Sequence, residues 1–214
     1  MNRMPGGVRE GGCEASPYSM ASAGHRPRRR AYSDWSAMNI VLTGYRCSGK
    51  TTVGRILARK TARGFVDMDR LIEKDTMRSI RSYVLEKGWE HFRTLEAGVV
   101  IGLADRDNLV IATGGGVVMD SDNVRNLKRN GWIVWLRASV STIKGRMKYE
   151  STVDESRPPL SGTDALVEIQ QVLNERTEFY ARASDYVIDA DGRAPGDVAH
   201  SIISALPKTV SAIG

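Results

Sequence analysis

The stretch that decides the fold is Gly44-Tyr45-Arg46-Cys47-Ser48-Gly49-Lys50-Thr51. It matches the pattern G-x-x-x-x-G-K-[ST] at every fixed position. The two glycines allow a tight turn in which backbone N–H groups approach phosphate oxygens, and the start of the next helix adds unpaired donors. Lys50 is placed to reach the β- and γ-phosphates, and the Thr51 hydroxyl is placed to ligate Mg²⁺. The predicted ATP-binding residues of this segment are Gly44, Ser48, Gly49, Lys50, Thr51 and Thr52.

Short apolar strands and helices alternate on either side of this loop. The expected strands are 39–43, 65–67, 109–112, 132–136 and 186–189. The expected helices are 50–62, 70–104 with a break near Gly88, 121–129, 139–147, 164–183 and one that starts near Pro195. Continuous apolar strands separated by helices are typical of a parallel sheet that is covered on both faces. With right-handed crossovers, five such strands predict a three-layer α/β/α sandwich.

The composition is that of one ordinary globular domain with a mild basic excess. The chain has 214 residues, a formal charge of +6 and 41% hydrophobic residues. No apolar run approaches the roughly 18 residues that a membrane span needs. The two cysteines, Cys13 and Cys47, are too far apart to indicate a disulfide framework, which favours a reducing compartment, the cytoplasm. We therefore expect neither a membrane nor a nucleic acid as partner.

Residues 1–37 differ from the rest of the chain. They are rich in Gly, Pro, Ser and Arg and show no helix or strand periodicity, so they are predicted to be a disordered N-terminal extension. The run Arg28-Arg29-Arg30 fits a solvated tail, and a nucleic-acid-binding, targeting or transit segment is the alternative. Met38 stands directly before the first strand, so the functional domain is expected over 38–214.

Two further groups of residues follow predicted strands. Asp67 and Asp69 come at the end of the second strand, where strand alternation would put them on the same side. Ligands bind at this edge of open α/β sheets, and two close carboxylates suit Mg²⁺ or a hydroxylated substrate. The run Gly114-Gly115-Gly116 directly follows the third strand and indicates close approach of backbone and ligand. A plain surface turn and a flexible turn are the respective alternatives.

Charged residues with helical spacing complete the set of candidates. Arg93 and Glu96 lie three residues apart on one predicted helix, where a surface ion pair is the alternative interpretation. Arg176 and Tyr180 share one face of the helix expected over 164–183. The segment Arg157-Pro158-Pro159-Leu160 lies in a polar stretch that is predicted to be a loop.

Taken in order, these residues resemble the shikimate kinase family over about residues 39–206. The matching motifs are Gly44–Thr51, Asp67-x-Asp69, Phe92-Arg93-x-x-Glu96, Gly114–Gly116, Arg157-Pro158 and Arg176-x-x-x-Tyr180. The resemblance implies a fold of the P-loop NTPase type, with five parallel strands in the order 2-3-1-4-5, a substrate-binding region at about 69–104 and a lid at about 148–163. It implies a monomer that converts ATP and shikimate to ADP and 3-phosphoshikimate with Mg²⁺, a step in aromatic amino acid biosynthesis.

The same resemblance implies a role for each matching position. Asp69 would bind substrate hydroxyls and accept the attacking proton, which makes Lys50, Asp69 and Arg157 the expected catalytic residues. Arg93 and Arg176 would grip the shikimate carboxylate beside backbone N–H groups of the glycine run. The remaining expectations are Glu96 as the partner of Arg93, Thr51 and Asp67 at the metal, Arg157 at the transferring phosphoryl group, and Arg146 and Pro195 on either side of adenine.

Two features depart from the family pattern. The lid motif reads Arg-Pro-Pro-Leu where Arg-Pro-Leu is commoner, and residue 91 is His where an acidic residue is common. Two rival functions also stay open. One is a related kinase for another polyol acid such as gluconate, and the other is a non-catalytic P-loop module that senses nucleotide.

Overall fold

The computed structural model of the protein describes residues 37–151 and 165–207, in which strands and helices alternate as predicted. The elements are β1 (Asn39–Thr43), α1 (Lys50–Thr61), β2 (Gly64–Asp67), α2 (Met68–Thr76), α3 (Ile80–Ala104), β3 (Leu109–Ala112), η2 (Val117–Met119), α4 (Ser121–Lys128), β4 (Gly131–Arg137), α5 (Val140–Ser151), α6 (Ala165–Ala183), β5 (Tyr186–Asp189) and α7 (Pro195–Ala205). All five predicted strands are present. No helix in the described ranges is both long and apolar enough to cross a membrane.

The five strands form one parallel sheet in the order β2-β3-β1-β4-β5, which confirms the predicted fold class. The central strand β1 is buried along its whole length and pairs with β3 on one side and β4 on the other. The chain therefore leaves β1 at the middle of the carboxyl edge, where the direction of the crossovers reverses. Ligands of open α/β sheets bind at such switch points.

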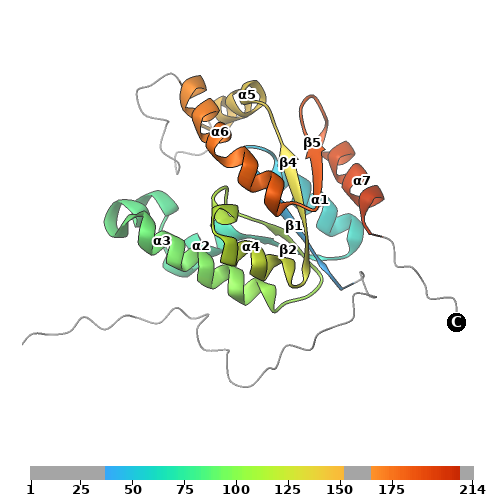
Figure 1. The fold of residues 1–214 in the computed structure, drawn as a ribbon, viewed down its shortest axis with the longest axis horizontal. Helices are drawn as coiled ribbons and strands as arrows, with labels where there is room; N and C mark the ends of the chain where they lie inside the picture. The colour runs from blue at the N-terminus through green and yellow to red at the C-terminus, as the bar shows by residue number, and fades with distance from the viewer. Residues whose placement is uncertain (1–36, 152–164, 208–214) are drawn as a thin grey trace, which may run out of the picture.

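Helices cover both faces of the sheet (Figure 1). Successive side chains of β1 point to opposite faces, as the pleat requires. Ile40 and Leu42 pack in the core with residues of α1 and α7, among them Leu57 and Ile202. On the other face, Val41 packs in the core with residues of α2, α3 and α4. The sheet thus holds the ends of β1, β2 and β3 in a fixed arrangement.

The helical region after β2 differs from expectation in one respect. The predicted break at Gly88 is confirmed, because this residue has φ 85° and ψ 166° within α3. A second break, which the sequence analysis did not predict, separates α2 from α3. There Met77 adopts a left-handed conformation with φ 53°, and Ser79 caps α3 by accepting a hydrogen bond from the N–H of Ser82. The serine cap stabilises a new helix start at this point, which favours two helices over one continuous helix.

The expected loop at 148–163 begins too early. Residues 148–151 form the end of α5, because they contain no proline or glycine that would interrupt the helix. The rest of the proposed lid, with Arg157, lies outside the described residues. The expected N-terminal extension lies outside them as well, except for Ala37, whose carbonyl accepts a hydrogen bond from the N–H of Asn108 at 2.7 Å.

Candidate active site

The phosphate-binding loop joins β1 to α1, and its backbone requires both fixed glycines. Gly44 has φ 139°, and a Cβ at this position would lie 2.6 Å from the carbonyl oxygen of Leu136. Gly49 has φ 105° and caps the N-terminus of α1. Cys47 also has a positive φ of 59°, which the sequence analysis did not predict. A side chain in this conformation carries backbone strain of about 1 kcal/mol or more.

Polar groups collect inside and beside this loop. The Lys50 ammonium donates to the carbonyl oxygens of Gly44 and Tyr45, at 2.8 Å each. Ser48 is buried, and within the described part of the chain its Oγ has no hydrogen-bond partner. Thr52 lies exposed in the first turn of α1, which contains no acidic side chain. An ammonium group, a hydroxyl group and a helix N-terminus are the groups that bind a polyphosphate.

Thr51 and Asp67 meet, as predicted for a metal site. The Thr51 hydroxyl donates to Asp67 Oδ2 at 2.6 Å, and Asp67 Oδ1 also accepts from the N–H of Arg70 at 3.4 Å, which caps α2. Among the described residues no group of three or more His, Cys, Asp or Glu side chains could hold a metal. Mg²⁺ at a nucleotide is held by one or two protein oxygens, phosphates and water, so these two residues fit that ion.

The two carboxylates do not share one side of a strand, so that expectation was wrong. The strand β2 ends at Asp67, and Asp69 lies in the first turn of α2, where the alternation of a strand no longer applies. Asp67 contacts Thr51 of the phosphate-binding loop. Asp69 Oδ1 instead lies 3.0 Å from the point that a Cβ on Gly114 would occupy. One carboxylate therefore faces the nucleotide side and the other faces the glycine run.

The glycine run Gly114–Gly116, between β3 and η2, lies close to charged side chains of α3, and its predicted close approach to a ligand stays a prediction. A Cβ on Gly114 would lie 2.7 Å from Glu96 Oε1, and one on Gly116 would lie 2.5 Å from Arg93 Nη2. The corresponding point on Gly115 is 3.6 Å from the carbonyl oxygen of Gly44. The run thus has the phosphate-binding loop on one side and α3 on the other. A larger side chain at its ends would displace the charged groups of α3.

Arg93 is held by a buried partner, which removes the alternative of a surface ion pair. Its Nη1 lies 2.5 Å from Glu96 Oε2, and Glu96 is only 1% exposed. Burial raises the pKa of Glu96, while the charge and hydrogen bond of Arg93 oppose this shift. The guanidinium also lies over the rings of Trp89 and Phe92, at 5.4 and 5.5 Å from their centroids. One carboxylate and two aromatic rings therefore contact the guanidinium in this position.

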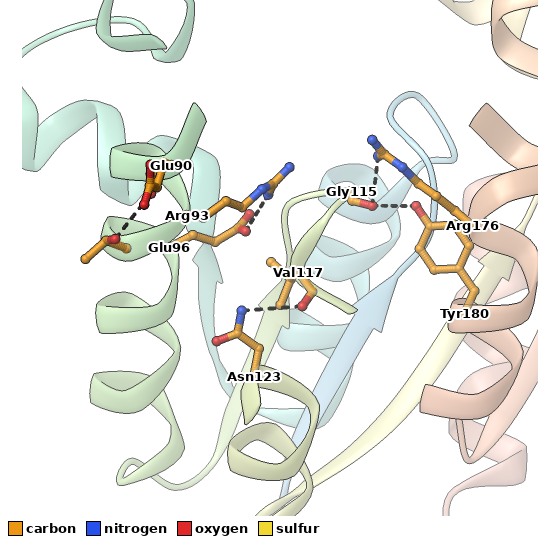
Figure 2. A network of polar contacts seen from close by, with 9 residues as sticks. Glu90, Arg93, Glu96, Gly115, Val117, Asn123, Arg176 and Tyr180 are labelled. Atoms are coloured by element: carbon orange, nitrogen blue, oxygen red, sulfur yellow. Dashed lines mark hydrogen bonds and ion pairs between the residues drawn. The ribbon is translucent and has the colours of Figure 1, made fainter. Parts of the chain in front are cut away.

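Arg176 reaches the glycine run from α6. Its Nη1 donates to the carbonyl oxygen of Gly115 at 3.3 Å, and the Tyr180 hydroxyl donates to the same oxygen at 2.6 Å. Figure 2 shows Arg93 and Arg176 on opposite sides of the glycine run, which they approach from α3 and α6. Tertiary structure therefore brings together the four predicted acceptor-side features: Asp69, Arg93, the glycine run and Arg176.

The two residues expected at adenine occupy neighbouring parts of the structure. Arg146 donates to the carbonyl oxygens of Cys47, Ser48 and Ala190, at 3.2, 2.9 and 3.2 Å. It thereby ties the phosphate-binding loop to the segment that follows β5. Pro195 is the first residue of α7, which begins shortly after this segment. Their contact with adenine stays a prediction.

For two polar residues of the site, the structure shows a feature that their spacing in the sequence did not predict. Glu96 is a buried member of the site, whereas its spacing from Arg93 fits an exposed pair equally well. Tyr180 contacts the glycine run, and the only signal for this was its spacing of four residues from Arg176. His91, which departs from the family pattern, is exposed on α3.

The comparisons with known proteins agree with this geometry. The family model for shikimate kinase matches residues 46–207. A shikimate kinase of Symbiobacterium thermophilum is 43% identical over 80% of this chain and 97% of its own length, and one of Persephonella marina is 37% identical over 78% and 98%. A solved shikimate kinase of Acinetobacter baumannii in complex with shikimate matches with a TM-score of 0.73 and 34% identity, over 78% of this chain and 91% of that one. The chain therefore belongs to the shikimate kinase family, the kinases that phosphorylate shikimate with ATP.

Proposed function

We propose that this chain transfers the γ-phosphoryl group of ATP to the 3-hydroxyl of shikimate, giving ADP and 3-phosphoshikimate, a step in aromatic amino acid biosynthesis. The observation that carries the proposal is the position of the glycine run. A Cβ on Gly115 would contact the phosphate-binding loop and one on Gly116 would clash with the guanidinium of Arg93, so the run lies next to both, and Arg176 donates to the carbonyl of Gly115. The phosphoryl donor would thus bind on one side of this run and the carboxylate-bearing acceptor on the other, close enough for transfer between them.

On the donor side, phosphoryl transfer needs positioning and charge neutralisation more than covalent chemistry. Lys50 would place its ammonium at the β- and γ-phosphates, and backbone N–H groups of the loop would hold the remaining oxygens. Thr51 and Asp67 would hold Mg²⁺, which supplies charge neutralisation at the phosphates when bound. Arg146 and Pro195 would flank adenine. Arg157 stays our proposed contact to the transferring group on the strength of its match to the family motif.

On the acceptor side, Arg93 and Arg176 would bind the carboxylate, because a planar guanidinium matches a carboxylate in a two-pronged fork. Asp69 would accept a hydrogen bond from the attacking hydroxyl. As the new bond from this hydroxyl oxygen to the γ-phosphorus forms, the bond from phosphorus to the bridging oxygen breaks. ADP leaves, and the hydroxyl proton passes to Asp69.

An assay that couples ADP release to a spectroscopic signal tests this function against both rivals. The substrates are shikimate, gluconate and other hydroxy acids, each with and without Mg²⁺. We expect turnover with shikimate that depends on Mg²⁺, and phosphorus NMR of the product should show a phosphomonoester at the 3-position. Faster turnover of gluconate would favour the polyol-acid kinase. Tight nucleotide binding without turnover of any acceptor would favour the sensing module.

We propose that the chain acts as a monomer in the cytoplasm, with ATP and shikimate as its partners and without nucleic acid or membrane. The chain has only two cysteines, Cys13 and Cys47, far apart in the sequence, which suits a reducing compartment. Light scattering coupled to size-exclusion chromatography tests the oligomeric state, and a stable dimer would contradict it.

A further inference from the structure

Tyr180 is a buried polar residue that the proposed mechanism does not use. Its side chain in α6 is fully buried and stacks on the ring of Trp135 in β4, with centroids 5.6 Å apart and an angle of 23° between the planes. Val118, which follows the glycine run, belongs to the same buried cluster. The ring therefore cannot change its position without repacking between α6, β4 and the start of η2.

The hydroxyl of this fixed ring donates a hydrogen bond to the glycine run. Its oxygen lies 2.6 Å from the carbonyl oxygen of Gly115. Burial raises the pKa of Tyr180 to about 12, so the phenol keeps its proton throughout the neutral range. A carbonyl can only accept, so the phenol is the donor. Arg176 Nη1 donates to the same oxygen from one turn earlier in α6, as Figure 2 shows.

These two donors decide the orientation of one peptide group. The described residues contain no cis peptide bond, so the N–H of Gly116 points opposite to the carbonyl of Gly115. Because that carbonyl points to α6, the N–H of Gly116 points away from α6. A peptide between two glycines has little side-chain hindrance to rotation, so it needs such an external restraint.

The two donors are not equivalent. Arg176 has a flexible side chain that the proposed function assigns to the substrate carboxylate, and its contact with Gly115 is long. The Tyr180 hydroxyl is on a ring that packing holds in place. When Arg176 turns toward a bound carboxylate, Tyr180 still restrains the carbonyl of Gly115.

We propose that Tyr180 is a positioning residue of the acceptor site. It holds the Gly115–Gly116 peptide in the orientation that presents the N–H of Gly116 to the acceptor, and it leaves Arg176 available for the carboxylate. This inference rests on the proposed function for the identity of the acceptor, but the orientation of the peptide can be measured without any substrate.

The test variant is Tyr180→Phe, which keeps the ring and its stack on Trp135 and removes only the donor. Tyr186→Phe is a matched control, because Tyr186 stacks in the same way on Trp132 of β4, with centroids 5.5 Å apart and an angle of 20°. We expect Tyr180→Phe to lower kcat/KM for shikimate about tenfold. The reason is that the N–H of Gly116 would no longer be held toward the acceptor, which costs one neutral hydrogen bond in the transition state. The affinity for an ATP analogue should stay unchanged, and Tyr186→Phe should match the wild type in both.

A second readout on free protein separates this inference from the proposed function. The amide signal of Gly116 in a nitrogen–proton NMR spectrum reports a hydrogen bond to the preceding carbonyl. It should shift in Tyr180→Phe and stay in place in Tyr186→Phe, whichever substrate the enzyme uses. An unshifted Gly116 signal would overturn the inference. So would equal losses for shikimate and nucleotide, or a fall in melting temperature that accounts for the whole loss of activity. Failure of the wild type to phosphorylate shikimate would instead overturn the proposed function.

Discussion

The nucleotide side and the acceptor side of the site lie next to each other at Gly115, yet they are built in opposite ways. The phosphate-binding part of the first is one run, Gly44–Thr51, that leads from β1 into the first turn of α1, and its main-chain turns and two glycines create the binding groups. The second takes one side chain from α2, two from α3, one from α6 and the backbone of the glycine run. A local motif is thus enough for phosphate binding, whereas recognition of the acceptor depends on how distant elements pack.

The largest expected effect separates chemistry from folding on the nucleotide side. Lys50→Met should lower kcat about 10²- to 10³-fold, because one preorganised positive charge is lost at the transferring phosphoryl group. The melting temperature should change little, since the loop is shaped by its backbone. Steady-state kinetics and thermal unfolding measure both. Lys60→Met, at the exposed end of α1, is the control, and near-normal turnover of Lys50→Met would remove this loop from the mechanism.

A substitution on the acceptor side should affect only one of the two ligands. Arg176→Ala should weaken shikimate binding by about 2–3 kcal/mol, because the carboxylate loses a charged partner. Binding of an ATP analogue should hardly change, and calorimetric titration measures both. The control is Arg182→Ala, an exposed residue of the same helix that pairs with Glu178. Equal losses for the two ligands would mean that Arg176 supports the fold instead.

The glycine run between the two sides can be tested by adding one methyl group, in the variant Gly116→Ala. Gly116→Ala would place a Cβ 2.5 Å from Arg93 Nη2, so the flexible guanidinium should move away. We expect kcat/KM for shikimate to fall about tenfold from misplacement of this group, with little change in stability. In Gly98→Ala the added Cβ would meet no atom within 4 Å, and it should raise helix stability slightly. Unchanged kinetics in Gly116→Ala would show that Arg93 does not bind the acceptor in this position.

The smallest expected effect concerns the buried carboxylate that holds Arg93. Burial raises the pKa of Glu96 above its ordinary value of 4.5, so the folded state binds this proton more tightly than the unfolded state does. The stability due to that proton is complete below the ordinary pKa and is lost as the pH rises through the raised value. Glu96→Gln cannot titrate at this position. Its free energy of unfolding should therefore increase relative to that of the wild type as the pH rises through this window. Urea unfolding at a series of pH values measures the difference, and a constant difference would contradict the assigned shift.

The five strands and the phosphate-binding loop were predictable because each depends on neighbours in the sequence, whereas the strand order was predicted only through the resemblance to the family. Apolar runs define the strands, and the glycines at positions 44 and 49 define the turn whatever surrounds it. Two predictions of local structure failed because a strand or helix ended earlier than its sequence pattern indicated. Strand alternation predicts that Asp69 lies on the same side as Asp67, but β2 ends at Asp67 and α2 begins at Met68. The stop between α2 and α3 depends on a serine cap at Ser79 that helical periodicity does not reveal.

The sequence by itself determined the fold class and the nucleotide side, since hydrophobic periodicity and a contiguous glycine-rich turn act over a few residues. Only the tertiary structure decided how the predicted residues of the acceptor side come together and which other groups hold them. Glu96 is buried because α3 packs against the glycine run, and Tyr180 reaches Gly115 because α6 packs against β4. Burial and long-range hydrogen bonds depend on the distance between elements, and helical spacing places residues on one face without saying what that face contacts.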